Sequence, residues 1–85
     1  MMKNIVGKRV RQARYSANPR ITQDQLAARL QLQGISLERA AISKIETGIR
    51  PVTDVELVAI AKVLGTTVAW LVGESETLHD AQPTK

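Results

Sequence analysis

Apolar residues recur every three or four positions along most of the chain, and this spacing places them on one face of an α-helix. In the first such stretch the apolar stripe consists of Val6, Val10 and Ala13. The pattern predicts five short helices, over about residues 5–16, 22–32, 36–48, 53–65 and 67–72. The stripe stops at Gly73, so residues 74–85 are predicted to form a disordered tail.

Polar residues and glycines mark the ends of these predicted helices. Thr22 with Gln25, and Thr53 with Glu56, have the spacing of a capping box, in which the two side chains bond free amides reciprocally. Further candidate caps are Asn4 and Thr67 at helix starts, and Gly34, Gly48 and Gly65 at helix ends. The sequence therefore predicts helices with well-defined limits.

The start of the third helix has two candidates. Ser36 can cap it, with the apolar Ile35 and Leu37 on either side, and Glu38 is a competing start two residues later. We expect the helix to extend from Ser36 to Gly48.

The composition favours one small all-α domain. The 85 residues contain no Phe, one Trp and one Tyr, so the core has to come from Ile, Leu, Val and Ala. Such a core favours packed short helices, and we expect a compact bundle of five helices over residues 1–73. Trp70 stands beside Leu71 in the last predicted helix and is expected to fill the core rather than to stack on bases.

Several classes of function find no support in the residues. There is no cysteine, and the only histidine, His79, stands in the predicted tail without a partner, so we expect no metal site. No serine nucleophile motif and no glycine-rich phosphate loop occurs, so we expect neither enzyme activity nor a cofactor. No apolar run approaches the roughly 20 residues of a membrane span, and no secretory signal is visible. We therefore expect a soluble cytoplasmic protein.

The net charge of +4 is distributed unevenly along the chain. Residues 1–50 contain ten Lys and Arg against three acids, a net charge of +7, whereas residues 51–85 contain two Lys against five acids, a net charge of −3. A basic half beside an acidic half suggests one face for a polyanion and another face left free. On charge alone, an ordinary solvated surface explains the pattern equally well.

The two faces of the third predicted helix differ in chemistry. At 100° per residue, Ala40, Ser43, Lys44 and Thr47 share one arc with Arg39 on its flank, whereas the apolar Ile42 and Ile45 point the opposite way. Small and basic residues on one face suit close approach to a narrow, negatively charged groove, such as the major groove of DNA. The alternative for this stretch alone is a surface helix with a solvated polar face.

Motifs spread along the chain point to a known family. The most specific are Thr22-Gln23, Leu26-Ala27, Ile42-Ser43-Lys44-Ile45-Glu46-Thr47-Gly48, Ile60-Ala61, Leu64-Gly65 and Trp70-Leu71. Together they resemble the lambda-repressor and Cro-like helix-turn-helix family over about residues 5–73. The resemblance implies a lambda-repressor-like fold and a sequence-specific transcriptional regulator, a repressor that binds double-stranded DNA as a homodimer.

The resemblance also implies roles for individual residues. Arg39, Ala40, Ser43 and Lys44 occupy positions that contact base edges in the family. The positions of Gln23, Thr47, Gly48 and Arg50 are those of phosphate contacts. Arg14 matches a position that pairs with the acid at Glu46, and this ion pair would tie the first helix to the third.

The chain departs from the family pattern in both connections around the second helix. The connection before Thr22 is about two residues longer than usual, and the connection over residues 31–37 is about five residues longer. The role of Glu38 depends on the second of these, because an acid at a helix start favours the helix dipole but repels a phosphate. If the third helix begins at Ser36, Glu38 is instead a candidate acceptor from a cytosine amino group.

A second interpretation belongs to a different class of function. The same domain would act as a protein-interaction module, antitoxin-like or an adaptor, and its acidic half, with Asp54, Glu56 and the tail, would be the natural surface for a protein partner. The absence of salt-dependent DNA retention, together with a stoichiometric co-purifying protein, would favour this interpretation.

Overall fold

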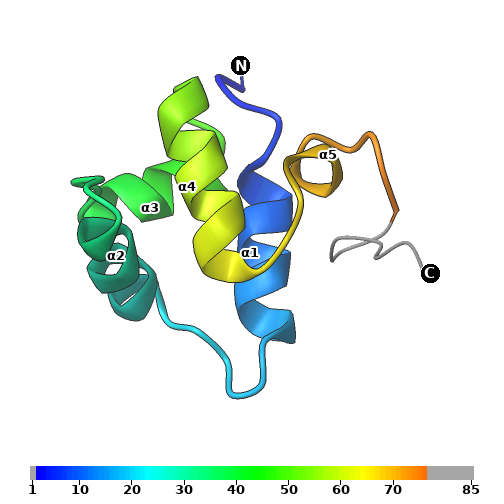
Figure 1. Ribbon diagram of the computed structural model, residues 1–85. Coiled ribbons are helices and arrows are strands. Elements are labelled where there is room, and N and C mark those ends of the chain that lie inside the picture. Colours follow the sequence, from blue (N-terminus) through cyan, green and yellow to red (C-terminus); the bar gives the residue numbers. More distant parts are fainter. Residues whose placement is uncertain (1, 77–85) are drawn as a thin grey trace.

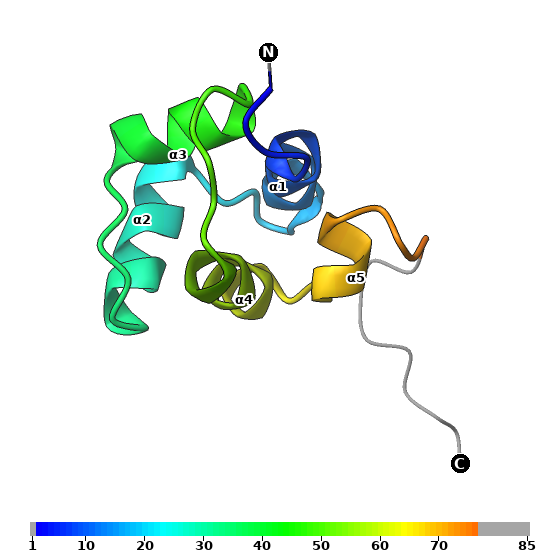
Figure 2. The ribbon, with the colours of Figure 1, turned by 90° about the horizontal axis from the view of Figure 1, so that it is seen from above.

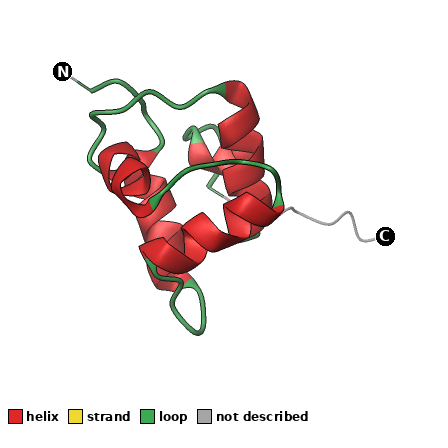
Figure 3. Cartoon of the chain, turned by 90° about the vertical axis from the view of Figure 1, so that its left-hand side faces the viewer, coloured by secondary structure: helices red, strands yellow, loops and turns green. Residues whose placement is uncertain are grey.

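The computed structural model describes residues 2–76, and these residues form five α-helices (Figure 1). The helices are α1 (Gly7–Ser16), α2 (Gln23–Leu32), α3 (Arg39–Glu46), α4 (Asp54–Leu64) and α5 (Val68–Leu71). Figure 3 shows only helices and loops in the described part of the chain. The predicted all-α fold of five short helices is therefore confirmed. Residues 77–85, most of the predicted tail, lie outside the described residues.

Seen from above, α1, α2, α3 and α4 surround a common interior, and α5 covers α1 and α4 at one end (Figure 2). Aliphatic side chains fill this interior, and Leu26, Leu30 and Leu71 are completely buried. Trp70, which is 4% exposed, belongs to the same core, as predicted. Among the described residues, no helix has the length and apolar character needed to cross a membrane.

The capping predictions are confirmed. The hydroxyls of Thr22, Thr53 and Thr67 each accept a hydrogen bond from an amide three residues later, and both predicted capping boxes are complete. The N-cap position of α1 is Val6, and Asn4, two residues earlier, supplies the capping oxygen: its Oδ1 accepts from the amides of Val6 at 2.9 Å and Gly7 at 2.8 Å. These hydrogen bonds explain why the helices begin close to the positions that the sequence indicates.

Glycines in left-handed conformations follow four of the helices: Gly34, Gly48, Gly65 and Gly73. Gly34 after α2 has φ +82°, and Gly65 after α4 has φ +70°. After Gly34, the Ile35 amide donates to the carbonyl of Leu30 at 2.9 Å, which satisfies one of the last carbonyls of α2.

The predicted start of α3 at Ser36 is wrong, and the competing start at Glu38 is correct. Helix α3 begins at Arg39, and Glu38 is its N-cap in an extended conformation, with ψ 168°. Two neighbouring apolar residues explain the difference: the Ile35 amide closes α2, and the Leu37 side chain is buried in the core. The chain between α2 and α3 is therefore held extended, and Ser36 caps no helix.

Candidate nucleic-acid interface

The outer face of α3 is an exposed ridge of small, polar and basic side chains. Arg39, Ala40 and Lys44 are exposed, and Ser43 is half-buried. On the opposite face, Ile42 and Ile45 are each 1% exposed and anchor the helix in the core. The structure thus brings together the four residues proposed for base contacts and leaves them accessible.

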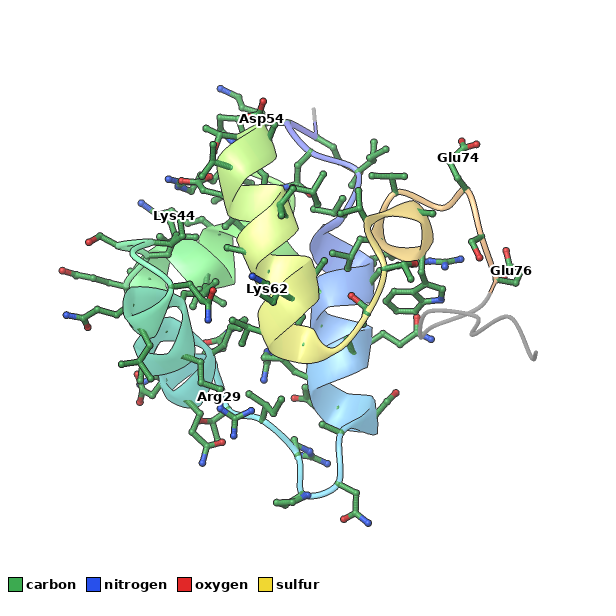
Figure 4. The ribbon with its side chains drawn as sticks, in the orientation of Figure 1. Arg29, Lys44, Asp54, Lys62, Glu74 and Glu76 are labelled. Atoms are coloured by element: carbon green, nitrogen blue, oxygen red, sulfur yellow. The ribbon has the colours of Figure 1, made fainter. Side chains whose placement is uncertain are left out.

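Two acidic residues near the end of the described chain lie away from α3. In Figure 4, Lys44 and Arg29 lie on the side of α2 and α3, whereas Glu74 and Glu76 lie on the opposite side, beyond α5. The surface that carries α3 is therefore free of these two carboxylates, which favours approach of a polyanion from that side.

Two open clefts flank α3. One, of about 580 Å³, lies between α1, the start of α2 and α3, and its lining includes Gln23, Arg39, Ser43 and Thr47. The other, of about 570 Å³, lies between α3 and the loop after it, and its lining includes Glu38, Lys44 and Arg50. A helical ridge with a hollow on each side has the shape needed to enter a groove that is bordered by two backbones.

The ion pair between Arg14 and Glu46 lies beneath the first of these clefts. Arg14 Nε donates to Glu46 Oε2 at 2.6 Å, and Arg14 Nη2 donates to Oε1 at 2.8 Å. The two side chains are 6% and 4% exposed. The hydrogen bond that Arg14 donates to Glu46 raises the pKa of Arg14, so the guanidinium stays charged in spite of its burial. This bidentate pair joins the last turn of α1 to the end of α3.

Gln23 joins the same network. Its Nε2 donates to Glu46 Oε1 at 3.1 Å, so the amide is oriented by the carboxylate that Arg14 also binds. Gln23 is the first residue of α2, where the amides of the first turn lack helical partners. The remaining amide hydrogen and these backbone amides are the donors that Gln23 offers to an anion.

Internal hydrogen bonds engage the residues proposed as the second phosphate contact. The Thr47 hydroxyl donates to the carbonyls of Ser43 at 3.1 Å and Lys44 at 3.3 Å. Arg50 forms an ion pair with Glu56 at 3.0 Å and donates to the carbonyl of Pro51 at 2.8 Å. The hydrogen bond from Arg50 lowers the pKa of Glu56. To bind a phosphate, the Arg50 side chain would have to share or leave its carboxylate partner.

Gly48 has a left-handed conformation, with φ +82°, and is covered by the residues before α1. The Lys3 amide donates to the Gly48 carbonyl at 2.6 Å, and a Cβ on Gly48 would contact the Met2 side chain. Glycine is favoured here because an L side chain in this backbone conformation would be strained.

The sequence interpretation missed two features of the site. Asn4 was predicted only as a cap, yet its Nδ2 also donates to the carbonyls of Ile45 at 3.0 Å and Arg50 at 2.7 Å. Tyr15 lines the first cleft together with Arg11 and Arg20, none of which was proposed as a site residue. The Asn4 contacts arise from the packing of the chain before α1 against the end of α3, and the Tyr15 cluster is completed by the path of the α1–α2 connection, which places Arg20 beside the ring.

Glu38 caps α3 without a side-chain hydrogen bond, at the rim of the second cleft. The suggestion that Glu38 accepts from cytosine required α3 to begin at Ser36, and α3 begins at Arg39. The carboxylate therefore lies at the positive end of the helix dipole. Within residues 2–76, no cluster of His, Asp or Glu could hold a metal ion.

Comparison with known families agrees with this geometry. A family model described as helix-turn-helix matches residues 20–71, which include α2, α3, α4 and α5 and more than half of the chain. Searches of curated proteins and of solved structures find no match. In the matched region, α2 and α3 follow one another as the two helices of a helix-turn-helix do, in which the first helix crosses the DNA backbone and the second contacts the bases. The chain belongs to the lambda-repressor and Cro-like helix-turn-helix family, and its fold is that of a DNA-binding transcriptional regulator.

Proposed function

We propose that the protein is a sequence-specific repressor that places α3 in the major groove of double-stranded DNA. The exposed ridge of α3 between two clefts carries this proposal, because its small and basic side chains permit close approach to base edges. Family membership supports DNA binding by this domain.

Each residue of the ridge has a proposed partner on a base. The Arg39 guanidinium and the Lys44 ammonium donate to O6 and N7 of guanine, the Ser43 hydroxyl donates or accepts, and the Ala40 methyl contacts the methyl group of thymine. Arg39 lies 3.9 Å from Asp24, and both side chains are largely exposed. Such a pair contributes about 0–1 kcal/mol, so Arg39 can leave it for a base at little cost.

Phosphate contacts on the two sides of the ridge orient α3. Gln23 and the first turn of α2 bind one backbone, and Thr47, Gly48 and Arg50 bind the other. These contacts would supply salt-dependent affinity without direct sequence information.

A repressor of this kind binds as a homodimer on a near-palindromic site. Two copies of α3 then contact half-sites about one helical turn apart, roughly 34–36 Å. The proposed dimer surface is the region of α5, where Val68 and Val72 are half-buried at the edge of the core.

Selection of preferred sites from randomised duplexes tests the proposal. A recurrent near-palindrome with half-sites one turn apart is expected, and its affinity should fall steeply as salt rises. Enrichment of no sequence over random duplex would contradict specific binding.

Two variants separate base contacts from phosphate contacts. Lys44→Ala should relax preference at one base position, with a loss of about 1–3 kcal/mol on the selected site, whereas Gln23→Ala should weaken binding equally on all duplexes. Lys62→Ala removes an exposed lysine of α4 and is the matched control, which should leave base preference unchanged.

A second candidate function rests on the outer face of α4. Val55 and Val58 are 63% and 57% exposed beside the acidic Asp54, a combination that suits a protein partner. We propose this interaction module, antitoxin-like or an adaptor, as the alternative. Binding of a protein partner that is lost in Val55→Ser, with no retention on DNA at low salt, would establish it in place of the repressor.

A further inference from the structure

We propose that Arg11, Tyr15 and Arg20 form a further phosphate-binding site, which holds a DNA backbone phosphodiester at the end of α1. This site, hereafter the α1-end site, rests on the proposed DNA-binding function. It lies outside the contacts assigned above to α2, α3 and the loop after α3.

Three guanidinium groups converge on the ring of Tyr15. The Cζ atoms of Arg20, Arg11 and Arg14 lie 4.3, 5.2 and 5.3 Å from the ring centroid. Tyr15 is 45% exposed, so the ring is a platform at the surface rather than a core residue. Cation–π attraction holds the three guanidinium groups at the ring. Arg14 is buried, whereas Arg11 and Arg20 are exposed and accessible from solvent.

The connection between α1 and α2 fixes Arg20 in this position. The buried Ile21 is held at both backbone groups, since its amide donates to the Arg14 carbonyl at 3.1 Å and its carbonyl accepts from Arg14 Nη1 at 2.9 Å. Arg20 immediately precedes this anchored residue. The lengthened connection therefore directs a cation back over Tyr15.

The charges around Tyr15 are not balanced by acids. Arg14 is neutralised by Glu46, and Arg39 faces Asp24. Across residues 2–76, neither Arg11 nor Arg20 forms an ion pair. The nearby Arg11 guanidinium is the main cause that lowers the pKa of Tyr15, and the phenol hydroxyl has a hydrogen that it can donate. Two unneutralised guanidinium groups and one hydroxyl donor are suited to an anion.

The same cleft connects these donors to the proposed reading face. Its lining runs from Arg11, Tyr15 and Arg20 through Gln23 to Ser43 and Thr47 of α3. A DNA strand whose phosphate lies on Gln23 would continue along this cleft to the α1-end site. Planar guanidinium groups match the oxygens of a phosphate, which favours a phosphodiester as the occupant.

The test measures how duplex affinity depends on salt for Arg20→Gln, Arg11→Gln and Tyr15→Phe. If each arginine contacts one phosphate, the slope of log K against log salt should decrease by about 0.9 for each arginine removed. Affinity at 0.1 M salt should fall by roughly tenfold on every sequence, with base preference unchanged. Tyr15→Phe should weaken binding without changing the slope. Lys62→Gln, which removes an exposed basic residue of α4 outside the cleft, is the control and should retain the wild-type slope.

The outcomes separate the two proposals. If the wild-type protein shows no salt-dependent duplex binding, the proposed function itself fails. If the wild-type protein binds but Arg11→Gln and Arg20→Gln keep its slope, the α1-end site is overturned while the proposed function stands. Titration with inorganic phosphate, followed by the NMR signals of the arginine Nε–H groups, provides a second arm. Saturable shifts at Arg11 and Arg20 without any change of slope on DNA would indicate a site for free phosphate and would overturn the assignment to the DNA backbone.

Discussion

Glu46 connects the helices that form the candidate DNA-binding site. Its two carboxylate oxygens accept from Arg14 twice and from Gln23 once, so one side chain links α1, α2 and α3. The pairing with Arg14 was expected from the family resemblance. The link to Gln23 could not be predicted, because it depends on the angle at which α2 crosses α3. One buried carboxylate thus orients both a structural cation and a proposed phosphate ligand.

Arg14→Ala should lower the free energy of unfolding by about 3–5 kcal/mol, because it leaves Glu46 buried without its cation. Urea unfolding measures the loss, and affinity for the selected duplex should fall with it. Arg39→Ala breaks an exposed pair and should cost about 1 kcal/mol or less. Replacing both partners, with Arg14→Met and Glu46→Leu, should recover much of the stability. A loss below about 1 kcal/mol in Arg14→Ala would show that the pair does not hold α1 to α3.

Glu56→Gln should reduce the dependence of stability on pH. Because the hydrogen bond from Arg50 lowers the pKa of Glu56 in the folded state, this carboxylate stabilises the fold above its ordinary pKa of about 4.5. That contribution is lost as the pH falls through the folded-state pKa. Glutamine keeps the oxygen that accepts from the Thr53 amide, so mainly the charge is removed. Chemical unfolding between pH 7 and pH 2 should give a shallower decline below about pH 4.5 for Glu56→Gln. Arg50→Gln should show the same effect, and parallel curves would refute the assigned cause.

At the scale of elements, the start of α1 lies directly on the end of α3. A Cβ on Gly7 would overlap the backbone carbonyl oxygen of Ile45, and Asn4 donates to that same oxygen while it caps α1. The free amides at the start of one helix thus approach the free carbonyls at the end of another, an arrangement that both helix dipoles favour. This close approach fixes the distance between the start of α1 and the end of α3.

Gly7→Ala should lower the free energy of unfolding by about 1–3 kcal/mol, because the backbones of α1 and α3 must move apart. Helix propensity alone predicts the opposite result, an increase of roughly 1 kcal/mol in the free energy of unfolding. The sign of the measured change therefore distinguishes the steric effect from helix propensity. Urea unfolding measures the change, and Lys8→Ala, at the exposed next residue, should be nearly neutral. A stabilised Gly7→Ala variant would mean that the two helices are farther apart than described.

Features of the helices that depend on neighbouring residues could be predicted from the sequence, whereas a feature that depends on packing between helices could not. Four helix starts and their caps follow from Asn4, Thr22, Thr53 and Thr67, since capping is a property of neighbouring residues. The start of α3 was misassigned because the burial of Leu37 in the shared core outweighed the local capping signal of Ser36. The faces of α3 were predicted correctly, since helical periodicity alone sets them.

For the whole molecule, the sequence predicts the charge asymmetry but not its geometry. The basic residues of the first half come from α1, α2, α3 and the loops beside them, and only folding gathers Arg11, Arg20 and Arg39 around one cleft. The contacts of the residues before α1 could not be predicted from the sequence either, because they join residues more than 40 positions apart in the chain. Composition therefore indicates the class of ligand, whereas the surface that binds the ligand can be identified only from the structure.

The position of Lys3 and Met2 has a practical consequence for measurements in which one partner is immobilised. These residues lie over Gly48, at the end of α3. A solid support or a fluorophore coupled on the amino-terminal side would stand beside the proposed reading helix and would hinder access of the duplex. Coupling on the carboxyl-terminal side, beyond Glu76, would hold the molecule by the surface opposite Lys44 and present α3 to solution (Figure 4).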